Sequence, residues 1–281
     1  MSASLSESKS LSVIIEPSSG WSALRLADIW HFRELLYFLT WRDIKIRYKH
    51  TALGVGWVVL QPLLTMLVFT VFFGRLGRIP SDGVPYALFS LCGLLPWQLF
   101  SYALTESSQS VVASERVISK VYFPRLLVPL SAVLAGLADF MVSFGVVFVF
   151  MAVFRVVPGP AIILLPAFLV LAVATALGAG LWLSALNVQY RDVRYTLSFL
   201  TQFWLLATPV AYPSSLVPEQ WRALVGLNPM AGVVEGFRWV LLGTPAPHGP
   251  MLIVSIMISA GLLVTGAFYF RRMERGFVDV I

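Results

Sequence analysis

Apolar and polar positions along this chain are grouped in long blocks. Apolar runs, interrupted by charge only at Asp139, cover about 52–74, 84–105, 126–154, 161–187, 195–212 and 251–270. Roughly 20 such residues suffice for a helix to cross the hydrocarbon core of a bilayer. The pattern therefore predicts an all-α, polytopic membrane protein with six transmembrane helices.

The segment 30–49, ahead of the first apolar run, is basic and amphipathic. As a helix it carries two separate stripes, one of Tyr37, Trp41, Ile44 and Tyr48 and the other of Arg42, Lys45 and Lys49. Such a helix suits a membrane interface, with its aromatic side at the headgroups. We predict an N-terminal amphipathic interface helix here, preceded by a disordered cytoplasmic tail over 1–20.

Between the fifth and sixth runs, the segment 213–249 is too interrupted to span a membrane and too apolar for a solvated loop. Apolar residues recur at helical spacing on both sides of Asn228-Pro229. We predict two short re-entrant helices that dip into the outer leaflet. They are expected to line the exit through Trp221, Asn228, Pro229, Glu235 and Arg238. The alternative is a surface lid that does not contact the substrate.

Composition and charge agree with a membrane protein. A chain of 281 residues that is 58% hydrophobic and 12% charged has more apolar surface than one soluble core requires. Its net charge of +6 indicates cationic loops at the cytoplasmic leaflet rather than nucleic-acid binding. Placing both termini inside puts 15 of the 20 basic residues on the cytoplasmic side. The positive-inside rule therefore predicts that both termini are cytoplasmic.

The sequence has no motif for catalysis. It contains no Gly-x-x-x-x-Gly-Lys-Ser/Thr loop for a nucleotide, no His-Glu-x-x-His pair, no serine elbow and no cysteine cluster. The single cysteine, Cys92, lies inside an apolar run, and the three histidines are far apart in the sequence. We expect neither an enzyme nor a resident cofactor or metal.

Six stretches of the chain carry a family resemblance. They are YKHTALGVGWVVLQP (48–62), GVPYALFSLCGLLPWQLFS (83–101), ISKVYFPRLLVPL (118–130), LNVQYRDVRY (186–195), ATPVAYP (207–213) and LNPMAGVVEGFRWVLLG (227–243). Over 21–281 the chain resembles the membrane subunit of ABC-2 type exporters, and specifically their polysaccharide-export branch.

The resemblance implies a homodimeric permease that pairs with two copies of a separate ATPase subunit, which binds ATP and Mg. The implied substrate is an undecaprenyl-pyrophosphate-linked polysaccharide, such as O-antigen, capsule or teichoic acid, which leaves the cytoplasm across the bacterial inner membrane. The polar loop 106–124 would couple to the ATPase through Ser114, Glu115, Arg116, Val117, Ile118 and Lys120. The alternative for this loop is an ordinary solvated connection.

Two further sets of residues are candidates for contact with the substrate. The first would meet the lipid pyrophosphate near the cytoplasmic mouth and consists of Arg42, Lys45, Arg47, Tyr48, Lys49, Leu53 and Gly54. Attraction of these cations to anionic lipid is the alternative. The second set would line the channel and consists of Trp57, Gln61, Asp139, Phe199, Phe203 and Trp204. For the aromatic residues the alternative is packing against lipid; for Asp139 it is a hydrogen bond to a neighbouring helix.

Two other functions remain open from the sequence. One is an ABC-2 exporter of a drug, of haem or of lipid alone. The other, from a different class, is a membrane-bound enzyme or assembly factor that acts on a lipid-linked sugar. A neighbouring ATPase gene together with glycosyltransferase genes would favour polysaccharide export over both.

Overall fold

The structure, a computed structural model, describes residues 26–49 and 54–277. The predicted tail over 1–20 and the candidate Leu53 lie outside the described residues. Within the described ranges all regular secondary structure is helical, so the predicted all-α fold is confirmed.

The helices follow one another along the chain with short connections. In order they are α1 (Leu26–His31), α2 (Arg33–Lys49), α3 (Gly56–Phe69), η1 (Thr70–Leu76), α4 (Tyr86–Ala113), α5 (Glu115–Ile118), α6 (Leu127–Val153), η2 (Pro160–Leu164), α7 (Leu165–Gln189), α8 (Val193–Ala207), η3 (Ser214–Leu216), α9 (Glu219–Val225), α10 (Pro229–Leu242), α11 (Gly249–Met273) and η4 (Glu274–Gly276). Five stretches of the described chain are long and apolar enough to cross a membrane: α3 with η1, α4, α6, η2 with α7, and α11. The protein is therefore a multi-pass membrane protein.

The predicted fifth span, 195–212, differs from the expectation because its helix is short. α8 has 15 residues, or ~22 Å at the rise of an α-helix, whereas the hydrocarbon core is ~30 Å thick. The helix ends at Ala207, and the next residue, Thr208, is extended, with ψ 137°. The following Pro209 disfavours helical backbone at the residue before it.

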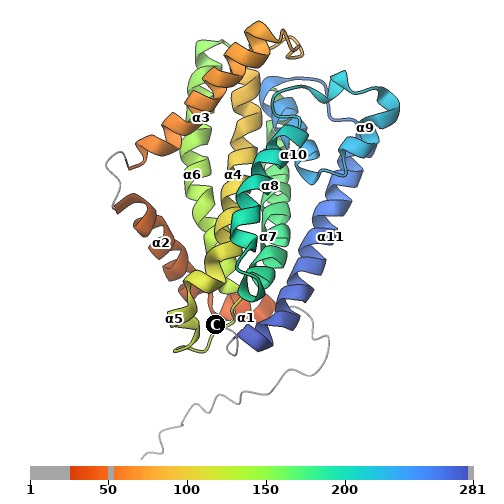
Figure 1. Cartoon of the computed structure of the whole chain (residues 1–281). Helices are drawn as coiled ribbons and strands as arrows, with labels where there is room; N and C mark the ends of the chain where they lie inside the picture. Colours follow the sequence, from red (N-terminus) through yellow and green to blue (C-terminus); the bar gives the residue numbers. More distant parts are fainter. Residues whose placement is uncertain (1–25, 50–53, 278–281) are drawn as a thin grey trace, which may run out of the picture.

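Figure 1 shows α1 and the end of α11 at the same end of the bundle.

α4 is the central helix of the bundle and packs against α6, α7 and α10 (Figure 1). The apolar window of α4 is 78% buried, against 17% for that of α3 with η1. α4 also extends beyond the predicted span into the predicted loop 106–124, and ends at Ala113. Ser114 then separates α4 from the short α5.

Small residues of α7 allow close packing against its two neighbours. A Cβ atom added at Gly178 of α7 would lie 2.5 Å from the backbone nitrogen of Leu263 on α11. One added at Gly180 would overlap the hydroxyl of Ser107 on α4. Small residues at helix interfaces let backbones approach closely in membranes, and here they bring α7 against both neighbours.

At the end of the bundle that carries α5, a second apolar cluster joins α2, α5, α6 and the end of α11, with Phe270 and Phe277 among its buried members. Charged groups close this cluster. The backbone N–H of Arg125 donates to Glu274 Oε1 at 3.0 Å, and its guanidinium donates to the Glu274 carbonyl. Arg271 pairs with the same carboxylate at 3.2 Å. We call Arg125, Arg271 and Glu274 the C-terminal clasp.

Candidate functional site

One face of α4 is polar although the rest of the helix is buried among apolar side chains. Between Leu88 and Ser110, the positions of α4 that are not buried are Gln98, Ser101, Tyr102, Thr105, Glu106, Gln109 and Ser110. These recur at spacings of three and four, so they form one stripe along the helix. A helix face against lipid would be apolar. The stripe therefore faces a polar space or a polar ligand.

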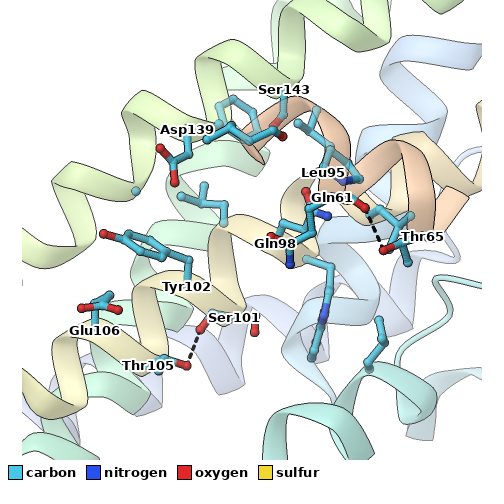
Figure 2. Close-up of a pocket in the computed structure, with 18 of the residues that line it drawn as sticks. Gln61, Thr65, Leu95, Gln98, Ser101, Tyr102, Thr105, Glu106, Asp139 and Ser143 are labelled. Carbon is cyan, nitrogen blue, oxygen red and sulfur yellow. Dashed lines mark hydrogen bonds between the residues drawn. The ribbon is translucent and has the colours of Figure 1, made fainter. Parts of the chain in front are cut away.

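That stripe lines a pocket of about 340 Å³ between α2, α3, α4 and α6. Figure 2 shows two ends of the pocket. At one end lie three ionisable side chains from α4 and α6, namely Tyr102, Glu106 and Asp139; at the other lie neutral polar side chains from α3 and α4, namely Gln61, Thr65 and Gln98. The pocket thus has an ionisable end and an uncharged, hydrogen-bonding end.

An ion pair between α2 and α6 forms the ionisable end. Arg47 Nη2 lies 2.6 Å from Asp139 Oδ2, with 37% of the Arg47 side chain and 14% of the Asp139 side chain exposed. The hydroxyl of Tyr48 donates to the other carboxylate oxygen. Burial and this hydrogen bond raise the pKa of Tyr48, so its hydroxyl stays protonated as a donor. The partner that a carboxylate in a span requires is therefore present.

The aromatic ring of Tyr102 completes this end of the pocket. The guanidinium carbon of Arg47 lies 4.0 Å from the ring centroid, a cation–π contact. Gly136 of α6 makes room for the ring, because a Cβ atom there would lie 2.6 Å from Tyr102 Cδ1. Arg47 is thus held by a carboxylate and a ring from two different helices.

The remaining cations of α2 differ in whether a carboxylate pairs with them. Arg42 pairs with the adjacent Asp43 at 2.8 Å. Lys45 and Lys49 are exposed and form no ion pair among the residues described. They are four residues apart, so they share a face of α2. Gly54, two residues before α3, has φ +50°, a left-handed conformation that glycine adopts without strain.

The residues predicted to line a channel lie in three different surroundings. Trp57, Phe199 and Phe203 are all exposed, at 50%, 72% and 62%, and Gln61 lines the pocket. The indole of Trp204 instead donates to Asn228 Oδ1 at 2.9 Å and packs on Phe100. Trp204 therefore connects helices within the subunit.

The residues predicted to line an exit need a correction. The two short helices are present as α9 and α10, with Asn228 as the N-cap of α10 and Pro229 at its first position. Trp221 is exposed, but Glu235 and Arg238 are buried inside the subunit, with 5% and 0% exposed. The expectation that this pair lines an exit is wrong.

The physical reason is that Arg238 binds backbone carbonyls where α8 ends. Its Nη1 donates to Pro209 O at 2.6 Å, its Nη2 to Val210 O and its Nε to Phe89 O. α8 ends at Ala207, so the carbonyls of Pro209 and Val210 lie beyond the helix and have no helical partner. Glu235 balances the charge at 3.4 Å and accepts from the Ser214 N–H. Helical spacing alone could not indicate which way this pair points.

The residues predicted to couple to the ATPase differ in their exposure. Ser114 and Ile118 are buried, and Ile118 belongs to the apolar cluster beside the C-terminal clasp. Glu115, Arg116 and Lys120 are exposed, and Val117 is half-buried. α5 is therefore anchored through Ile118 and presents charged side chains outward.

Sequence reasoning missed the part of the pocket that α4 contributes. Gln98, Tyr102 and Glu106 are spaced by four, and the first two lie inside the second predicted span. Polar residues at helical spacing within an apolar run were the available signal. α4 continues as a helix through Pro96, so these three residues stay on one face.

Comparison with known proteins gives consistent matches. Residues 34–242 match the family model described as ABC-2 type transporter. An O-antigen export system permease protein RfbA from Myxococcus xanthus is 29% identical over 256 residues, which cover 90% of this chain and 98% of the relative. One from Klebsiella pneumoniae is 28% identical over 251 residues, covering 88% and 95%. The polysialic acid transport protein KpsM of Escherichia coli is 21% identical over 241 residues, covering 83% and 91%.

Proposed function

This chain belongs to the ABC-2 type transporter family, and from that premise we propose that it is the membrane-spanning permease subunit of an ATP-driven exporter of lipid-linked polysaccharide. One observation carries the proposal: relatives named for O-antigen export match it over nearly the whole length of both chains. The polar stripe of α4 supports it, because an exporter of apolar drugs or lipid alone has no need of a hydrogen-bonding pocket beside its first span.

In this proposal two copies of the chain form the translocation path, and two copies of a separate ATPase subunit bind ATP and Mg and drive it. The exposed aromatic residues Phe199 and Phe203 lie four apart on α8, so they share one face, which no helix in the described part of the chain covers. A second copy on this face would enclose a path between the subunits. Aromatic rings there would let a sugar chain slide without tight binding.

The substrate in this proposal is an undecaprenyl-pyrophosphate-linked chain that is moved out across a bacterial inner membrane. α2 and α5 then lie on the cytoplasmic side, with both termini. Lys45 and Lys49 are the exposed cations of α2 without a carboxylate partner among the described residues. We assign them, rather than the neutralised Arg47, to the pyrophosphate.

The function is tested in cells that lack this chain. Lipid-linked glycan should accumulate inside the inner membrane, and restoring the chain should return the glycan to the cell surface. Normal surface glycan in its absence would contradict the proposal.

The role of α5 is tested by replacing Arg116 and Val117 together with Asp. The exposed cation and its half-buried neighbour become acidic, so we expect the ATPase subunit to be lost from the purified complex and its hydrolysis to fall to the uncoupled rate. The Arg78→Asp variant, at the opposite end of the bundle, is the control and should retain both. Intact assembly and turnover in the α5 variant would show that α5 does not couple.

A further inference from the structure

Resting on the function proposed above, we infer that the pocket between α2, α3, α4 and α6 binds one uncharged sugar ring of the lipid-linked chain, the ring joined to the pyrophosphate. The pyrophosphate itself stays outside the pocket. The pocket would then recognise the kind of sugar that begins the chain, separately from the lipid carrier.

The charges in the pocket argue against a phosphate group as its occupant. Arg47 is the cation that lines it, and Asp139 already pairs with Arg47 at 2.6 Å. Glu106 adds a second carboxyl group to the same wall. A pyrophosphate placed here would meet two carboxyl groups and one arginine that is already neutralised, which is an unfavourable balance for a multivalent anion. A polyol with no charge meets no such repulsion.

The neutral end of the pocket supplies what a sugar requires. Gln61 and Gln98 each offer an amide with two donors and an acceptor. Within the described part of the chain, no hydrogen bond joins either side-chain amide to another protein group. The hydroxyls of Thr65 and Thr105 donate to carbonyls of their own helices, so their lone pairs remain available as acceptors. These groups match the mixed donors and acceptors of sugar hydroxyls.

The size of the pocket limits the ligand to a small unit. A volume of about 340 Å³ lies at the lower end of the range for small-molecule sites, roughly 300–1,000 Å³. Along α4 the polar wall runs from Gln98 to Glu106, eight helical rises or ~12 Å. That is room for one ring and its substituents and not for a chain.

The position of the pocket selects the first ring. Arg47 and the exposed Lys49 both belong to the last turn of α2. If the pyrophosphate contacts the exposed cations of α2, a ring bonded directly to it is close enough to enter beside Arg47. Later rings of the chain would be too far from the membrane carrier to do so while the pyrophosphate is bound.

The test measures binding of two probes to the complete complex of permease and ATPase in lipid nanodiscs: undecaprenyl pyrophosphate, and the same lipid bearing a single hexose. We expect the wild-type complex to bind the glycosylated lipid at least about five-fold more tightly, the factor for one net hydrogen bond. Gln98→Leu on α4 and Gln61→Leu on α3 should each remove that preference and leave the affinity for undecaprenyl pyrophosphate unchanged. Gln220→Leu, the same change on the exposed α9, should retain the preference.

Three results would overturn the inference. Equal affinity of the wild-type complex for the two probes would show that the pocket does not recognise the ring. If Gln98→Leu lowers the affinity for both probes by the same factor, the pocket holds the lipid phosphate or the carrier. If neither probe binds or stimulates hydrolysis by a complex that hydrolyses ATP, the proposed function itself fails, and the inference fails with it.

Discussion

Two arginine–carboxylate pairs, at different places in this subunit, show how the same two residue types serve different purposes. Arg238 and Glu235 lie on one helix and are buried. The Arg238 guanidinium donates hydrogen bonds to backbone carbonyls of the segment after α8. Arg47 and Asp139 join two helices and border an open pocket. Both guanidinium groups also lie over an aromatic ring, at 3.6 Å for Phe89 and 4.0 Å for Tyr102.

The surroundings of each pair decide whether it serves stability or ligand binding. Around Arg238 there is no space for a ligand, because Gly93 and Phe89 of α4 pack directly on the guanidinium. Around Arg47 the polar stripe of α4 leaves a cavity. We therefore assign the first pair to the stability of the fold and the second to the site, and the following variants test that division in order of expected effect.

Arg238→Lys should give the largest loss of stability. A lysine ammonium cannot reach carbonyls on α4 and on the segment after α8 at once, and it leaves a buried carboxylate poorly paired. We expect the free energy of unfolding to fall by about 3–5 kcal/mol, seen as a strong drop in thermal stability or in yield of monodisperse protein. Arg222→Lys, on α9, is the control. A stable Arg238→Lys protein would show that the carbonyl contacts of Arg238 are dispensable.

Gly93→Ala should give the second-largest loss of stability. Its Cβ atom would lie 2.5 Å from Arg238 Nη2, and the guanidinium is fully buried and held by three backbone carbonyls. Overpacking of this kind costs about 1–3 kcal/mol, and we expect the upper part of that range from thermal unfolding in detergent. A neutral result would mean that the Arg238 cluster is looser than the packing indicates.

Gly136→Ala should lower the stability less than Gly93→Ala does, although the steric overlap of the added Cβ atom is similar. Its Cβ atom would lie 2.6 Å from the Tyr102 ring, but the ring can shift into the adjacent pocket. We expect about 1 kcal/mol in stability together with a measurable loss of export, because the pocket is partly filled. Gly145→Ala on the same helix meets nothing within 4 Å and should match the wild type. Equal losses for Gly136→Ala and Gly93→Ala would contradict the contrast between the two sites.

Asp139→Asn should have the smallest effect on stability and a clear effect on function. The pair it breaks is partly exposed, so solvent screening limits the loss to below about 1 kcal/mol. Arg47 and Tyr48 lose their shared ionised acceptor, and we expect export to fall about five-fold or more, the equivalent of ~1 kcal/mol. Normal export at normal abundance would assign Asp139 a structural role alone.

Much of the fold follows from hydropathy, because burial in lipid imposes long apolar helices. The five full-length stretches correspond closely to predicted runs. The shortening of α8 follows from Pro209 acting on Thr208, a local effect that an average over a window does not register. The two short helices around Asn228 were predicted from turn chemistry and spacing, and both are present.

The site was less predictable, because its contacts join distant parts of the chain. Tyr48 and Asp139 are 91 residues apart, and nothing local in either segment specifies the other. The cations of α2 look alike in sequence, yet Arg47 turns toward α6 and is neutralised while Lys45 and Lys49 remain exposed. In the same way, the spacing of Glu235 and Arg238 predicted a helix but did not indicate that the pair faces the interior.

The C-terminal clasp has a consequence for the order in which the protein matures on the ribosome. Arg125 follows α5, and Glu274, which binds it, is 149 residues later in the chain. At translation rates of roughly 5–20 residues per second, Glu274 is made about 7 to 30 s after Arg125. During that interval the loop bearing α5 lacks its clasp. A chain that stops before Glu274 would therefore lack the contacts that tie Arg125 to the end of α11, beside the surface proposed to receive the ATPase.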